Sequence, residues 1–182
     1  MQSFLRFLIL FPLCGLLSCA GGTESDNHTD VAINTPAEVK QAAAAELDSY
    51  DASFADGMTE KVFQNYLHLR DALVASDAAE AARVSGFMAA AFGPDHAEAK
   101  RRAQAIHQAG DIEVQRAEFT QLTAAVGPLF EQGLSGGTIY KQYCPMAFDN
   151  TGADWYSDSE KILNPYFGDR MLRCGKVTQV IQ

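Results

Sequence analysis

The sequence predicts a mainly α-helical protein: an antiparallel bundle of about four helices over residues 58–134, closed by a C-terminal cap of irregular structure and short β-strands. Apolar residues recur at helical spacing through the bundle region, which indicates helices with one buried face. Capping and helix-breaking residues divide this region into segments with short connections, as is typical of antiparallel neighbours. After residue 134 the helical periodicity ends and aromatic residues become frequent, which indicates the cap.

The four expected helices follow from this pattern. The first carries an apolar stripe of six residues: Val62, Phe63, Tyr66, Leu67, Leu73 and Val74. Asp77 is the expected N-cap of the second helix, which ends at Gly93-Pro94. The proline opens a third helix that reaches Gly110, and Asp111 caps the fourth. We expect Gly127-Pro128 to kink or shorten the fourth helix, because proline cannot donate a backbone hydrogen bond.

The cap, residues 135–182, is expected to pack on the bundle. Residues 138–143 and 176–181 alternate as strands do, and glycine and proline interrupt the stretch between them. Aromatic residues such as Trp155 and Tyr166 are too apolar to be left in water, so this stretch should be ordered. Four acidic residues miss the spacing of a calcium-binding loop and are expected to form a solvated rim: Asp149, Asp154, Asp158 and Glu160.

The first 18 residues read as a bacterial lipoprotein signal peptide. One arginine precedes an apolar run over residues 7–17, which is shorter than the roughly 20 residues needed to span a bilayer. Leu16-Leu17-Ser18-Cys19 resembles a lipobox, so we expect cleavage before Cys19 and lipidation of Cys19. The alternative is an ordinary signal peptide cut near Ala20. Residues 19–57 are expected to form a flexible tether with a short helix over residues 36–48.

This N-terminal segment predicts a protein that is held in the cell envelope by its lipid anchor. By resemblance to the lipoprotein sorting pattern, Ala20 implies the outer membrane, with the domain facing the periplasm. The net charge of −9, without a basic patch, argues against a nucleic-acid partner. The chain has no HExxH, Walker-type, GxGxxG or CxxC motif, and we expect a non-enzymatic protein.

Two of the four cysteines belong to the folded domain. Because Cys14 leaves with the signal peptide and Cys19 is lipidated, Cys144 and Cys174 remain, in an oxidising compartment where a disulfide is the default. A disulfide would close a loop of about 30 residues and stabilise the fold by roughly 3–4 kcal/mol. The domain would then be a structural or protein-interaction module of the envelope.

The other hypothesis is a soft-metal site. Met146 and Met171 stand two or three residues from Cys144 and Cys174, so if the two stretches meet, two thiols and two thioethers converge. Such ligands select Cu(I) and similar ions, and the ring of Trp155 nearby would add a cation–π contact. A reducible cysteine pair would be able to switch between the two states.

Five stretches of the chain carry a resemblance to a known family: Tyr66–Val74, Gln142–Ala147, Gly152–Ser157, Asn164–Gly168 and Met171–Gly175. They resemble an uncharacterised domain family of Gram-negative envelope proteins, found as stand-alone lipoproteins and appended to membrane-fusion (adaptor) proteins of copper/silver-type efflux systems. The resemblance covers about residues 59–177. It implies a heavy-metal role with Cu(I) or Ag(I) and, as partners, efflux-system components or another envelope protein; it brings no catalytic residues.

Overall fold

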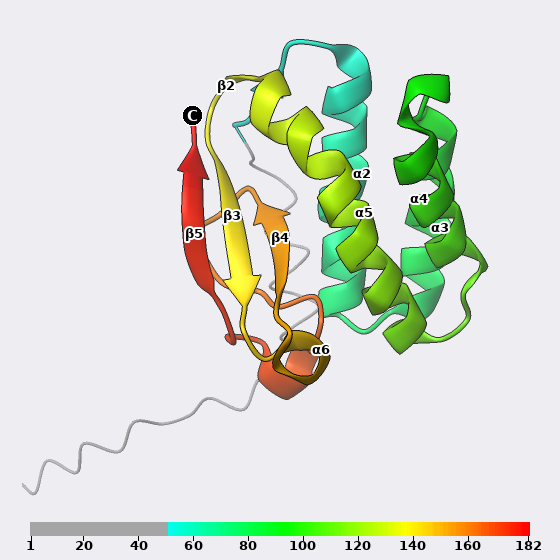
Figure 1. Ribbon diagram of the computed structural model, residues 1–182, viewed down its shortest axis with the longest axis vertical. Helices are drawn as coiled ribbons and strands as arrows, with labels where there is room; N and C mark the ends of the chain where they lie inside the picture. The colour runs from blue at the N-terminus through cyan, green and yellow to red at the C-terminus, as the bar shows by residue number, and fades with distance from the viewer. Residues whose placement is uncertain (1–50) are drawn as a thin grey trace, which may run out of the picture. The chain divides into compact units, whose positions relative to one another are not determined.

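The computed structural model describes residues 51–182 as helices on one side of a small β-sheet (Figure 1). The expected signal peptide, Cys19 and most of the tether, with its short helix, lie outside the described residues. Four long helices follow one another: α2 (Gly57–Val74), α3 (Ala78–Ala91), α4 (Ala97–Gln108) and α5 (Ile112–Gly133). The 3-10 helix η1 (Pro94–His96) leads into α4. The predicted mainly α fold with a C-terminal β cap is confirmed.

Aspartate caps set the starts of α2, α3 and α5. The Asp77 carboxylate accepts the backbone N–H of Glu80, and the Asp111 carboxylate accepts those of Glu113 and Val114, as the sequence predicts. Asp56, which the sequence pattern did not single out, caps α2 in the same way. Each cap satisfies backbone donors that have no partner inside the helix.

The last long helix is not shortened at Gly127-Pro128: α5 continues to Gly133 with Pro128 inside it. The reason is the packing that follows the proline. Phe130 is fully buried, and its ring lies 5.0 Å from the ring of Phe63 and 5.2 Å from that of Tyr66. Burying this side chain offsets the loss of the backbone hydrogen bond that proline cannot make.

The cap contains a three-stranded antiparallel sheet in the order β4-β3-β5. Its strands are β3 (Ile139–Cys144), β4 (Ala153–Ser157) and β5 (Lys176–Ile181); a separate pair joins β1 (Ser53–Phe54) to β2 (Leu134–Gly136). Two short helices, α6 (Ala147–Asn150) and η2 (Gly168–Met171), lie in the loops. Figure 1 shows α2 and α5 between the sheet and the α3–α4 pair. The sequence pattern anticipated β3 and β5 and missed β4.

Two buried arginines attach the cap to the bundle. Arg70 of α2 donates to the Ser157 hydroxyl at 2.8 Å and to the Asp158 carboxylate at 3.0 Å. Arg116 of α5 donates to the Pro165 carbonyl at 2.9 Å and to the Leu73 carbonyl at 3.0 Å. The expectation of a solvated acidic rim is therefore wrong for Asp158. Its side chain is only 5% exposed because it forms an ion pair with the buried Arg70.

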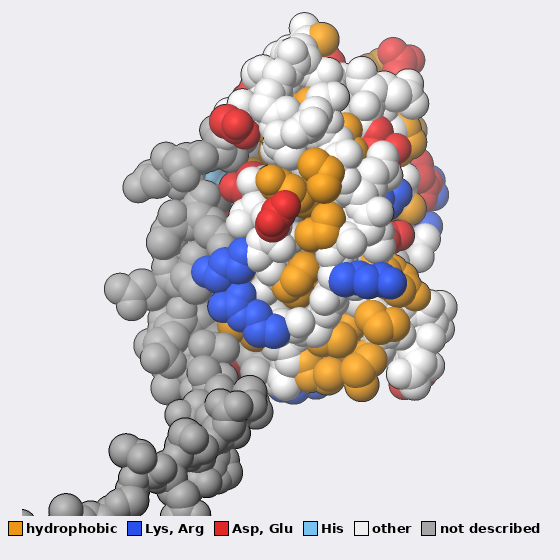
Figure 2. Space-filling view, turned by 90° about the vertical axis from the view of Figure 1, so that its left-hand side faces the viewer, with side chains coloured by type: hydrophobic (Ala, Val, Ile, Leu, Met, Phe, Trp, Pro, Cys, Tyr) orange, Lys and Arg blue, Asp and Glu red, His pale blue; other side chains and the backbone are white. Residues whose placement is uncertain are grey.

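The helices of residues 51–182 include none with the length and hydropathy of a membrane span. Figure 2 shows the face of the molecule that carries β5, where hydrophobic side chains gather between Lys and Arg side chains. Val180 of β5 is 50% exposed, so this strand leaves part of the sheet uncovered by the described residues.

Candidate functional site

The sheet brings Cys144 and Cys174 together. Cys144 is the last residue of β3, and Cys174 stands two residues before β5. The two strands pair antiparallel with Tyr143 opposite Lys176, so continuing this register brings Cys144 opposite Gly175, the neighbour of Cys174. The two sulfur atoms are 2.9 Å apart. The condition that both sequence hypotheses require, that the two distant stretches come together, is therefore fulfilled at the cysteines.

The cysteines are present as two thiols in contact. A disulfide bond is about 2.05 Å long, so their sulfurs are closer than unrelated thiols and are not bonded. Cys144 is fully buried, and Cys174 is partly exposed. Burial, and then the hydrogen bond with Cys144, raises the pKa of Cys174 to about 11. At neutral pH Cys174 is therefore protonated and a weak nucleophile.

Both methionines lie next to this pair. The backbone N–H of Met146 donates to the Cys174 sulfur, and the N–H of Cys174 donates to the carbonyl of Met171 at 3.0 Å. Both methionines line one surface cavity of about 460 Å³, together with aromatic side chains that include Phe148 and Phe167. Met146 is 46% exposed, so its side chain lies at the surface of the protein.

The turn that carries this cavity is strained. Phe148, Asp149 and Asn150 all have positive φ, at 51°, 56° and 68°. Each such residue costs on the order of 1 kcal/mol or more and persists only where the surrounding structure enforces it. The Phe148 ring, 38% exposed, packs edge-on against Tyr166 at 5.4 Å between ring centres. This contact holds an apolar side chain at the surface beside Met146.

Trp155 lies near the cysteines but inside the protein. It is fully buried, and its ring meets Tyr166 edge-on at 6.0 Å between centres. A Cβ on Gly175 would come within 2.7 Å of the Trp155 ring, so the indole lies against the backbone next to Cys174. The expected cation–π neighbour is thus adjacent to the pair and shielded from solvent.

Carboxylates and histidines do not add to this site. Among the residues from 51 to 182, no three His, Cys, Asp or Glu side chains are grouped so that they would hold a metal ion. A metal at the cysteine pair would therefore depend on sulfur alone, which suits soft monovalent ions rather than Ca²⁺ or Mg²⁺.

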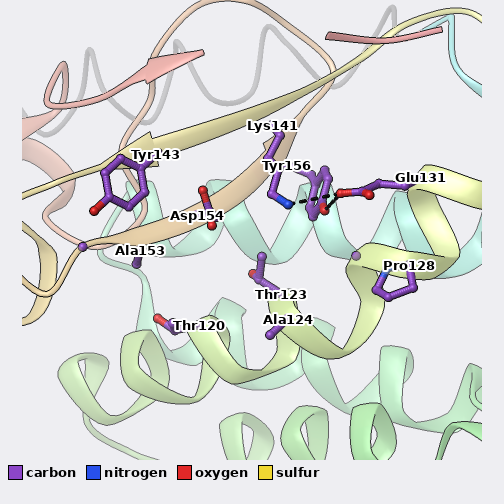
Figure 3. A pocket seen from close by; sticks show the side chains of 12 residues that line it. Thr120, Thr123, Ala124, Pro128, Glu131, Lys141, Tyr143, Ala153, Asp154 and Tyr156 are labelled. Carbon is purple, nitrogen blue, oxygen red and sulfur yellow. Dashed lines mark hydrogen bonds and ion pairs between the residues drawn. The ribbon is translucent and has the colours of Figure 1, made fainter. Parts of the chain in front are cut away.

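A second cavity, of about 420 Å³, lies between α5 and the inner face of the sheet (Figure 3). Lys141 and Tyr143 of β3, and Asp154 and Tyr156 of β4, contribute to its wall. Sequence reasoning missed this cavity. The alternation of Lys141 and Tyr143 indicated that they share one face of a strand, but β4 had not been predicted, so nothing placed Asp154 opposite α5.

Residues 62–135, which span most of the helical bundle, match the model of a family described as a protein of unknown function (DUF3347). The match supports the resemblance to a domain family of unknown function and ends before the cysteine pair. No curated protein and no solved structure matches the chain.

Proposed function

We propose that this protein is a lipid-anchored, non-enzymatic component of the cell envelope, in the outer membrane and facing the periplasm, that binds Cu(I) or Ag(I). The observation that carries the metal assignment is the contact between Cys144 and Cys174, with both sulfurs 2.9 Å apart. In this role the protein would hold or deliver the ion, and its partner would be a component of an efflux system or another envelope protein.

The chemistry of the donor set supports a soft monovalent ion. Thiolates and thioethers are the ligands that Cu(I) prefers. The backbones of Met146 and Met171 contact Cys174, while their side chains line a surface cavity whose wall includes neither cysteine. Cys144 and Cys174 would be the anionic ligands, and the methionine thioethers at the adjoining cavity would complete the coordination or receive the ion as it enters.

Binding would release protons. A metal-bound cysteine is a thiolate, and Cys174, with its pKa raised to about 11, carries a proton at neutral pH. The metal must displace this proton, so the apparent affinity rises with pH, by about tenfold per pH unit for each proton released, until the pH passes the pKa of the thiol.

A second candidate function is a structural module with a Cys144–Cys174 disulfide. The observation that favours it is the same short separation together with the full burial of Cys144, since an oxidising compartment would join two thiols held this way. The aromatic cap would then present a surface to another envelope protein. Reduction opens the metal site, so the two functions belong to two redox states of one pair.

Competition with a coloured Cu(I) chelator tests the metal assignment on the reduced, detergent-solubilised protein. We expect wild type to withdraw one Cu(I) per chain and a Cys144→Ser/Cys174→Ser variant to withdraw none. A Met146→Leu/Met171→Leu variant, of similar volume and without thioethers, should bind about tenfold more weakly. If wild type takes no more copper than the serine variant, the metal function is refuted and the structural one remains; an unchanged leucine variant removes the methionines from the site.

A second measurement tests the anchor. Replacing Cys19 with alanine removes the sulfur that would carry the lipid, so the variant should lose the lipidated mass and either leave the membrane fraction or stay uncleaved. Cys14→Ala is the matched control, because Cys14 would leave with the signal peptide, and it should give the same mature mass as wild type. A Cys19→Ala protein with the lipidated mass would contradict the anchor.

A further inference from the structure

The cavity between α5 and the sheet has the size of a small-molecule site. Its volume of about 420 Å³ falls within the range of ligand pockets in proteins. In Figure 3 the side chains of Lys141, Tyr143 and Asp154 lie on the sheet side, and Thr120 and Thr123 lie on the helix side. The cavity is separate from the cysteine pair, which is not part of its wall.

Two glycines keep room for the tyrosine hydroxyls of the wall. A Cβ on Gly127 would come within 2.7 Å of the Tyr156 hydroxyl. Gly152, with φ of +82°, lies so close to Tyr143 that a Cβ would meet its hydroxyl at 2.0 Å. Both tyrosines can therefore approach the backbone closely, which places their hydroxyl groups at the cavity.

The charges of the cavity do not balance. Glu131 accepts hydrogen bonds from the Tyr156 hydroxyl at 2.5 Å and from the Lys141 ammonium at 3.2 Å. The bond from Tyr156 first, and then Lys141, lowers the pKa of Glu131, which keeps it ionised and paired. The Asp154 carboxylate makes no hydrogen bond or ion pair with residues 51–182. Because Lys141 is the only cationic side chain that residues 51–182 contribute to the wall, one negative charge of these residues is left over.

Two hydroxyl groups of the wall, those of Tyr156 and Thr120, offer acceptors rather than donors. Tyr156 already donates its proton to Glu131, and Thr120 donates its proton to the Arg116 carbonyl at 3.3 Å. Their oxygens therefore remain available only as acceptors, beside the carboxylate of Asp154. A ligand that matches this wall brings N–H donors and a positive charge.

We propose that this cavity binds a small organic cation, a primary amine with a short apolar body. The ammonium group would pair with Asp154 and donate to the hydroxyl oxygens, and the apolar body would lie against Ala124, Pro128 and the ring of Tyr143. A carboxylate or phosphate ligand is disfavoured, because it would meet the charge of Asp154 while the only ammonium in the wall is held by Glu131. This site does not depend on the proposed metal function.

Three probes of one shape test the charge preference by NMR titration of the ¹⁵N-labelled protein: 2-phenylethylamine, 2-phenylethanol and 3-phenylpropionate. We expect saturable shifts at the amides of cavity residues with the amine, binding about 10- to 100-fold weaker with the neutral alcohol, and no binding of the anion. Asp154→Asn, which keeps the shape and removes the charge, should weaken amine binding by the same factor.

Two control variants separate this result from a general effect. Asp95→Asn removes one exposed acid outside the cavity, and Cys144→Ser/Cys174→Ser removes the proposed metal ligands; both should bind the amine as wild type does. The amide spectrum of Asp154→Asn shows whether that variant is folded; if it is not, Thr120→Val, which removes one acceptor, takes its place. Equal binding of amine and anion, an unaffected Asp154→Asn variant, or no saturable binding to wild type would each overturn the proposal.

Discussion

The Arg70→Met variant is expected to unfold with a free energy about 3–5 kcal/mol lower than that of wild type. Arg70 lies in the core with a side chain only 1% exposed, and its guanidinium lies between two carboxylates, those of Asp71 at 2.7 Å and of Asp158 at 3.0 Å. Removing the cation takes away the positive charge that Asp71 and Asp158 share, which is the costly way to break a buried ion pair. Chemical denaturation, followed through the buried Trp155, measures the loss.

Burial and ion pairing have opposite effects on the pKa of Arg70. Burial would lower the pKa of Arg70, but the charges of Asp71 and Asp158 more than reverse that effect, so its pKa is raised and it stays protonated. The side chain also donates to Ser157, the residue at the end of β4. The variant should therefore loosen the cap before the bundle, because the contact that is lost joins the two.

Two variants decide whether charge or volume causes the effect. Arg83→Met removes an exposed ion pair with Glu80 from a side chain 54% exposed, and should leave the free energy of unfolding close to that of wild type. Adding Asp71→Asn and Asp158→Asn to Arg70→Met removes the two negative charges that Arg70 neutralises in wild type, so more than half of the lost stability should return. If the triple variant is no more stable than the single one, the destabilisation comes from packing and the electrostatic explanation is wrong.

The helical part of this fold can be predicted largely from patterns among residues that are close in the sequence. Asp77 and Asp111 identify helix starts because a cap is a contact between residues two or three positions apart. Pro128 misled the prediction because its effect depends on a distant partner: Phe130 packs against residues of α2, and that packing holds the helix together beyond the proline. Rules based on neighbouring residues account for the hydrogen bond that Pro128 cannot make, but not for the packing of Phe130 that offsets its loss.

Among the site residues, too, some were predictable from the local sequence and others depend on distant contacts. The meeting of Cys144 and Cys174 was only a condition of both sequence hypotheses, although strands were predicted just before Cys144 and just after Cys174, and the pairing of these strands brings the cysteines together. The role of Asp158 was not predictable, because an acidic residue in a loop looks solvated until the buried Arg70 is placed beside it. The amine cavity was missed for a third reason: it needs β4, whose five residues are too few and too mixed to read as a strand.

Oxidation of the cysteine pair is expected to raise the free energy of unfolding by about 3–4 kcal/mol. The loop between Cys144 and Cys174 spans 30 positions, and closing a loop of this length restricts the unfolded chain by that amount. Because the sulfurs are already 2.9 Å apart, the folded protein needs little movement to form the bond. Urea unfolding with and without a reductant measures the difference, and Cys144→Ser/Cys174→Ser, as control, should not respond to the reductant.

The size of this effect also decides when metal can compete with the disulfide. A ligand that binds only the folded, reduced protein stabilises it by RT ln(1 + [L]/Kd). To match about 3.5 kcal/mol, free Cu(I) must exceed its Kd by roughly 400-fold. Reduced protein saturated to this degree should therefore resist urea as well as the oxidised form does. Equal stability of the oxidised and reduced proteins without metal would show that the pair does not restrain the unfolded chain, and the structural function would lose its physical basis.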